Sequence, residues 1–89
     1  MAFEFDKNKS LSNKQKHGVD FVEAQILWED EGLLEIPANS EDEEQYIVIS
    51  QISSKVWAVV ITYRNSNVRI ISVRRARKNE VELYESSRF

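Results

Sequence analysis

Runs of Val, Ile and aromatic residues in the second half of the chain predict three β-strands. They cover residues 46–52, 56–64 and 68–76, and the middle run is apolar on both faces. The segments "SSK" and "NSN" between them have the composition of turns and are short enough to force antiparallel neighbours. We therefore expect a meander of three main strands, with at least part of both sheet faces covered.

The start of the chain predicts a short edge strand followed by a polar helix. In "FEFD", residues 3–6, the alternation favours a strand with both Phe side chains pointing inward. Asp6 is a suitable N-cap for a helix over residues 7–17, and Gly18 suits its C-terminal end. Leu11 is the main apolar residue of this helix, so we expect it to anchor the helix to the core.

A second helix is expected to follow and to continue through about Glu29. Asp20 and Glu23, three residues apart, resemble a capping box in which Asp replaces Ser or Thr. The apolar residues at helical spacing are Val22, Ile26 and Leu27.

The remaining segments predict sheet edges and a C-terminal helix. Residues 33–38 form a weaker strand that can pair at the sheet edge, and residues 37–44, with the only Pro, are typical of an exposed loop. Residues 78–86 predict a helix with Val81, Leu83 and Tyr84 as its apolar contacts. The expected fold is α+β, a single domain over residues 1–89. It has a small antiparallel β-sheet (a meander of three main strands plus short edge strands), two N-terminal helices and one C-terminal helix.

Composition narrows the possible chemistry. The 89 residues are enough for one small core, and they include no Cys and a single His. These counts exclude a disulfide framework and a zinc site, so we expect no metal and no cofactor. No apolar run is long enough to cross a bilayer, and the charged start lacks a signal-peptide core. We therefore expect a cytoplasmic protein with no membrane partner.

The formal net charge of -3 hides a division along the chain. Residues 29–45 contain eight carboxylates and no Lys or Arg, whereas residues 46–89 contain eight cations and three carboxylates. Such a cationic segment can attract phosphate on an acidic protein, because fields are screened beyond about 8 Å. The alternative is that the two segments neutralise each other as solvated faces. The cations at the junction of the last strand and the C-terminal helix are Arg74, Arg75, Arg77 and Lys78.

Arg77 occupies the expected N-cap of the C-terminal helix, where Ser, Thr, Asp or Asn is usual. Cations in the first turn also oppose the helix dipole. A phosphate held by backbone N–H groups and guanidinium groups would explain this choice. The alternative is a surface ion pair from Arg75 or Arg77 to the carboxylates of residues 41–44.

Four motifs occur together: "FEFD..K...N..KHGV.F..A" at the start, "EDEEQY" and "VVITYR" in the middle, and "RIISVRRARKNEVELYE" near the end. In this order they resemble the BrnT family of ribonuclease toxins of type II toxin–antitoxin modules. The resemblance implies a RelE/ParE-like fold and metal-independent RNA cleavage. It also implies neutralisation by a BrnA-like antitoxin in a heterotetramer, which contacts operator DNA only through the antitoxin.

The resemblance implies functional roles for Arg64, Arg74 and Arg75, whose guanidinium groups suit a phosphate in its transition state. We expect them to meet in one solvent-reachable pocket, although strand alternation sends Arg74 and Arg75 to opposite faces. The candidates for proton transfer are His17, Glu44, Glu80 and Tyr84. The candidates for substrate binding are Lys16, Arg77 and Lys78.

A non-catalytic module that binds protein or nucleic acid is the rival function, as is an inactive toxin that retains antitoxin binding. Trp28, Trp57 and the doubly apolar middle strand fit a protein interface equally well.

Overall fold

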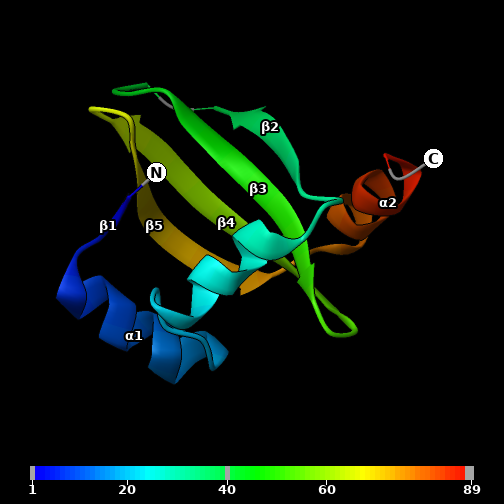
Figure 1. The fold of residues 1–89 in the computed structure, drawn as a ribbon, viewed down its shortest axis with the longest axis horizontal. Helices are drawn as coiled ribbons and strands as arrows, with labels where there is room; N and C mark the ends of the chain where they lie inside the picture. The colour runs from blue at the N-terminus through cyan, green and yellow to red at the C-terminus, as the bar shows by residue number, and fades with distance from the viewer. Residues whose placement is uncertain (1, 40, 88–89) are drawn as a thin grey trace.

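The computed structural model describes residues 2–39 and 41–87, which form a five-stranded mixed sheet with three helical segments (Figure 1). The sheet order is β1-β5-β4-β3-β2. The elements are β1 (Phe3–Glu4), α1 (Lys7–His17), η1 (Glu23–Glu29), β2 (Leu34–Ala38), β3 (Gln45–Ile52), β4 (Lys55–Arg64), β5 (Asn67–Arg75) and α2 (Lys78–Ser86). None of the described helices is long and apolar enough to cross a membrane.

The pairing of β1 corrects the expectation of a purely antiparallel sheet. Strands β3, β4 and β5 are antiparallel neighbours, but β1 lies parallel to β5, with Phe3 opposite Val68. A parallel pair needs a long connection, and here nearly the whole chain separates the two strands. Composition and alternation reveal that β1 is a strand but not which edge it joins.

The predicted loop over residues 37–44 begins later than expected. Pro37 and Ala38 belong to β2, which pairs with β3 and places Pro37 opposite Tyr46. A Pro is tolerated there because β2 is an edge strand, so the N–H that Pro lacks has no second neighbour to bind. Residues 39 and 41–44 are exposed, while Ser40 lies outside the described residues.

Helix α1 has the predicted ends but not the predicted anchor. The Asp6 carboxylate accepts hydrogen bonds from the backbone N–H groups of Asn8 and Lys9, and Gly18 ends the helix at φ 80. Leu11 is 64% exposed, so its predicted anchoring role is wrong.

Polar side chains hold α1 instead, because the helix packs beside β5, where backbone groups still need partners. The Asn13 Oδ1 accepts from the Val73 N–H at 3.1 Å, and its Nδ2 donates to the Val19 carbonyl at 2.8 Å. The Ser10 hydroxyl accepts from the Phe21 N–H.

The second helix is a 3-10 helix, η1, which begins at Glu23, later than the predicted N-cap at Asp20 implied, although the predicted capping box forms in the turn before it. Asp20 accepts from the N–H groups of Val22 and Glu23, and the Glu23 carboxylate accepts from the Asp20 N–H, which completes the capping box. With three residues per turn, burial falls on Ala24 and Leu27, while Val22 and Ile26 are exposed. The prediction of an α-helical apolar face was therefore wrong for Val22 and Ile26.

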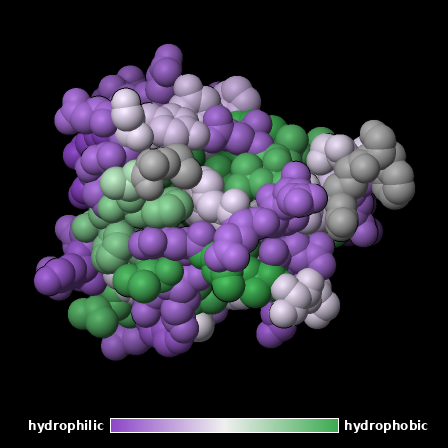
Figure 2. Space-filling model, viewed as in Figure 1, coloured by the Kyte–Doolittle hydropathy of each residue, from purple (hydrophilic) through white to green (hydrophobic). Residues whose placement is uncertain are grey.

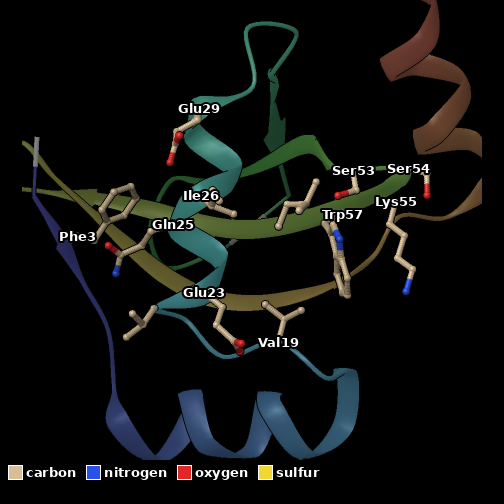
Figure 3. Close-up of a pocket in the computed structure, with 12 residues that line it drawn as sticks. Phe3, Val19, Glu23, Gln25, Ile26, Glu29, Ser53, Ser54, Lys55 and Trp57 are labelled. Atoms are coloured by element: carbon tan, nitrogen blue, oxygen red, sulfur yellow. The ribbon is translucent and has the colours of Figure 1, made fainter.

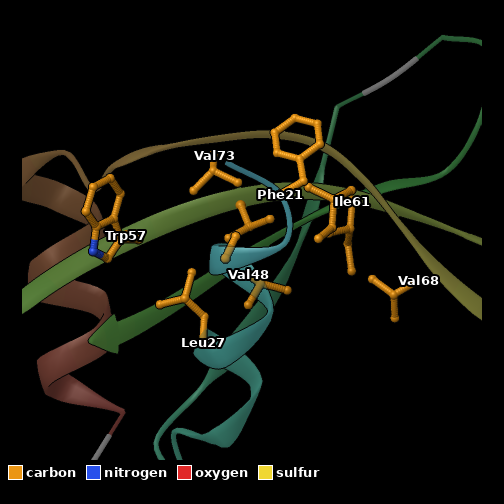
Figure 4. Close-up of a cluster of buried hydrophobic side chains, with 10 residues drawn as sticks. Phe21, Leu27, Val48, Trp57, Ile61, Val68 and Val73 are labelled. Carbon is orange, nitrogen blue, oxygen red and sulfur yellow. The ribbon is translucent and has the colours of Figure 1, made fainter. Parts of the chain in front are cut away.

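The main core lies between η1 and one face of the sheet (Figure 4). Phe21 and Leu27 pack there against Val48, Ile61 and Val73, and their side chains are 2% exposed or less. The predicted inward Phe residues both pack against this cluster, Phe3 on Trp28 and Phe5 on Phe21. On the opposite face, Ile49, Ala58 and the Tyr84 of α2 are also buried, so β4 is covered on both sides as predicted.

We predict that Asn13→Ala lowers the free energy of unfolding by about 1–3 kcal/mol, because it leaves the buried Val73 N–H and Val19 carbonyl without their partner. Urea denaturation measures the loss. Gln15→Ala, at an exposed position of the same helix, is the control and should change stability by less than about 0.5 kcal/mol. Equal effects of the two substitutions would contradict a polar anchor for α1.

Candidate active site

Arg74 and Glu80 form a two-point ion pair that joins the end of β5 to the first turn of α2. The Arg74 Nη1 lies 2.7 Å from one Glu80 carboxylate oxygen, and Nη2 lies 2.9 Å from the other. The side chains are 22% and 8% exposed. The Glu80 carboxylate also accepts from the Arg77 N–H at 2.8 Å, so it caps the helix as well.

The pair fixes the protonation state of Glu80. The hydrogen bond from Arg74 lowers the pKa of Glu80; burial opposes this, and the Arg77 N–H and the nearby positive charges reinforce it. The same contact raises the pKa of Arg74. Glu80 is therefore a carboxylate at neutral pH and has no proton to donate to a leaving group.

This geometry also explains how the helix tolerates Arg77 at its N-cap. A guanidinium has no acceptor atom, so only the half of the capping box that runs from the Arg77 N–H to Glu80 can form. A side chain of the protein, Glu80, thus supplies an anion at this helix start.

The three predicted arginines do not meet in one pocket, which is a correction of that expectation. Arg74 lies opposite Ala58 and Arg64 opposite Asn67, so they are six residues apart along β4, or about 20 Å. Arg64 lies 3.6 Å from Glu43 instead.

Arg75 points to the other face of β5, as strand alternation predicts. Its guanidinium carbon lies 5.5 Å from the centre of the Trp57 ring, in cation–π geometry. The alternative expectation was an ion pair from Arg75 or Arg77 to the carboxylates of residues 41–44. Among the described residues, it is Arg64 that pairs with this segment, through Glu43.

Tyr84 is 1% exposed, and its hydroxyl donates to the carboxylate of Asp30. Asp30 also accepts from Ser50 and from the N–H groups of Gly32 and Gln51. Burial by itself would raise the pKa of Asp30, but these hydrogen bonds outweigh it and lower the pKa. The network ties α2 to β3 and to the turn before β2.

Asp30 is not among the site residues predicted from the sequence, because it lies within an acidic run. The spacing Asp-x-Gly could have identified it, because in an Asx turn the Asp carboxylate accepts a hydrogen bond from the N–H two residues later, as Asp30 does from Gly32.

Lys16 and His17 line a hollow of ≈ 400 Å³ between α1 and β5. Ser72, on its other wall, lies two residues before Arg74 and on the same face of the strand. Arg77 and Lys78 are exposed at the nearby start of α2. Basic residues of α1 and of the start of α2 thus lie on the two helices that adjoin β5, one packed beside it and one following it in the chain.

Glu44 lies at the opposite end of the sheet. Its carboxylate accepts from the Tyr46 hydroxyl at 3.2 Å, and its backbone carbonyl accepts from Thr62, two residues before Arg64. Thr62 is four residues along β4 from Ala58, the residue opposite Arg74, so Glu44 lies toward the Arg64 end of the sheet.

A larger hollow of ≈ 950 Å³ separates η1 from the β3–β4 turn (Figure 3). Its lining is mostly apolar, including Ile26 and Trp57, and adds the carboxylates of Glu23 and Glu29. In the view of Figure 2, hydrophobic patches are exposed among hydrophilic side chains. Apolar surface offers no hydrogen bonds to a phosphodiester, and the two carboxylates, which repel it, outnumber the single cation of the lining, Lys55. The smaller cationic hollow is therefore the better candidate for nucleic acid. No cluster of metal-binding residues occurs in residues 2–39 and 41–87.

We predict that the stability of the wild-type protein falls more on acidification than that of Glu80→Gln. The folded pKa of Glu80 is below its ordinary value of 4.5, so its stabilisation is complete above that pH and is lost as the pH falls through the folded pKa. At neutral pH, Glu80→Gln should be less stable by about 1–3 kcal/mol, because Arg74 loses a charged partner.

Urea denaturation from about pH 7 to about pH 3 measures both quantities, and the two curves should converge in acid. Asp30, whose pKa is also lowered, is present in both proteins and cancels in the comparison. Parallel curves would contradict the assigned state of Glu80.

Comparison with known proteins adds an independent finding to this geometry. No curated protein matches the sequence significantly. A family model, described as the ribonuclease toxin BrnT of type II toxin–antitoxin systems, matches residues 5–80. This match includes α1, the whole sheet from β2 to β5 and the Arg74–Glu80 pair. Because it covers far more than half of the chain, the protein belongs to the BrnT family of ribonuclease toxins.

Proposed function

We propose that this BrnT-family protein is an endoribonuclease that cleaves RNA without a metal, with its active centre at the C-terminal end of β5. The observation that carries the proposal is the oriented guanidinium of Arg74, two residues along β5 from Ser72, which lines a hollow together with Lys16 and His17. The family match supplies the reaction class, RNA cleavage by a toxin.

Arg74 can hold a phosphate while it stays paired with Glu80. A guanidinium has five N–H groups, and three are used, two with Glu80 and one with the Arg75 carbonyl. The Nε–H and one Nη2–H remain to bind non-bridging phosphate oxygens. Glu80 holds the plane of the guanidinium in place, so we assign it a positioning role.

Cleavage then proceeds by attack of the ribose 2′-oxygen on the adjacent phosphorus. The bond from phosphorus to the 5′-oxygen breaks, which gives a 2′,3′-cyclic phosphate and a 5′-hydroxyl. Arg74 stabilises the charge that builds on the phosphate oxygens. His17 takes the proton of the 2′-hydroxyl and returns it to the leaving 5′-oxygen. Lys16, Arg77 and Lys78 bind the flanking phosphates.

The type II family implies an antitoxin partner. We propose that this partner is BrnA-like, that it forms a heterotetramer with the toxin in the cytoplasm, and that operator DNA is contacted through the antitoxin alone. The small sheet preceded by α1 and η1 and followed by α2 is compatible with a RelE/ParE-like fold.

We predict that antitoxin-free protein cleaves RNA in EDTA and that Arg74→Ala lowers the rate by about 10²–10³, the usual cost of removing a group that stabilises transition-state charge. Arg64→Ala is the matched control, since it removes the same side chain about 20 Å away along β4 and should cleave like the wild type. A gel assay with labelled RNA measures the rates.

The same assay distinguishes the rival function. Folded wild-type protein that binds RNA but does not cleave it would favour an interaction module or an inactive toxin. If Arg64→Ala abolished cleavage and Arg74→Ala did not, the active centre would belong at the opposite end of the sheet.

We predict that Tyr84→Phe lowers the free energy of unfolding by about 1–3 kcal/mol, because the half-buried carboxylate of Asp30 loses a donor, while the cleavage rate of the folded protein stays close to that of the wild type. Thermal unfolding and the gel assay measure the two effects. A rate loss of about 10² or more would assign proton transfer to Tyr84 instead.

A further inference from the structure

The hollow between α1 and β5 differs from the other described hollows in its charge. Among the residues that line it, Lys9, Lys16 and His17 carry basic groups, and none is a carboxylate. Four other hollows in the described part of the chain each include at least one Asp or Glu. On a protein with a net charge of -3, this is a locally cationic surface.

The spacing of its residues forms a stripe along α1. Lys9, Ser12 and Lys16 are separated by three and four residues, so they share one face of the helix. All three are exposed, and at about 1.5 Å per residue the two lysines are about 10 Å apart along the axis. Lys14 lies on a different face and pairs with Glu23 at 2.7 Å.

The position of the stripe relative to Arg74 is fixed by Asn13. This residue lines the same hollow, and it accepts the hydrogen bond from the N–H of Val73, the residue before Arg74. The stripe therefore begins beside the proposed active centre and leads away from it toward the start of α1.

We infer that Lys9, Ser12 and Lys16 form a subsite for the sugar–phosphate backbone of the RNA strand that enters the active centre. The inference rests on the proposed function for the identity of the substrate. The lysines neutralise successive phosphates, and the Ser12 hydroxyl donates to a phosphate oxygen or a sugar. Such contacts read no bases, so the subsite adds affinity and register but no sequence preference.

The test measures binding of a short single-stranded 2′-O-methyl oligoribonucleotide, which lacks the attacking hydroxyl and is not cleaved. Affinity of the antitoxin-free protein is measured by fluorescence anisotropy over a series of salt concentrations. Each phosphate contact contributes about 0.7 to the slope of log K against log salt for a single strand. Lys9→Gln and Lys16→Gln should each lower the slope by about 0.7, and the double variant by about 1.4.

Lys7→Gln is the matched control. Lys7 is exposed on the same helix and carries the same charge, but it does not line the hollow. It should leave the slope unchanged, and unchanged thermal midpoints show that all variants are folded. If Lys7→Gln lowered the slope as much as Lys9→Gln, the effect would be general charge and the subsite would be refuted. A wild-type protein that does not bind the oligonucleotide would also overturn it.

The outcome is separable from that of the proposed function. If the wild type cleaves RNA but the stripe variants bind like Lys7→Gln, the subsite fails and the ribonuclease stands. If the wild type binds through the stripe but never cleaves, the subsite stands as a nucleic-acid site and the ribonuclease fails.

Discussion

The ion pair between Arg74 and Glu80 is the interaction on which the arrangement of the C-terminal half depends. It closes the turn between β5 and α2, and the same carboxylate caps the helix through the Arg77 N–H. A largely buried ion pair gains little stability over apolar residues of the same size, because both ions lose hydration. Its contribution here is to orient the Arg74 side chain, because two parallel hydrogen bonds hold the guanidinium group in one orientation.

The Glu80 carboxylate also explains how two residues that are individually unfavourable at a helix start are tolerated in α2. Arg77 cannot act as a side-chain cap, and Lys78 in the first turn opposes the helix dipole. Glu80 offsets both, because its carboxylate lies at the positive end of the helix and bonds to an unpaired N–H. The helix can therefore start with cations beside the hollow and remain capped. In the same way, Asn13 lets the polar face of α1 lie against the sheet edge by accepting the Val73 N–H.

Local signals in the sequence predicted local structure well. Asp6 and Gly18 bound α1, Asp20 and Glu23 form their capping box, and alternation sends Arg74 and Arg75 to opposite faces. The separation of Arg64 from Arg74 was contained in the sequence, because the short β4–β5 turn pairs Arg64 with Asn67 and each later residue of β5 then lies farther from Arg64. The parallel pairing of β1, by contrast, depends on the route of the entire chain, which local spacing does not contain. The prediction that Leu11 anchors α1 was wrong because α1 packs against backbone groups at the edge of β5 rather than against a hydrophobic surface.

The pairing register of β4 and β5 also decides whether the acidic and basic segments neutralise each other or leave a cationic surface that can attract phosphate. The carboxylates of residues 41–44 lie at the Arg64 end of the sheet, where Glu43 pairs with Arg64. Arg74 is about 20 Å away along β4, more than twice the screening length of about 8 Å at physiological salt. The acidic loop therefore neutralises Arg64 but leaves the field around Arg74 and the α1 stripe almost unchanged. An acidic protein can thus present a cationic surface to RNA because the strands hold its opposite charges apart.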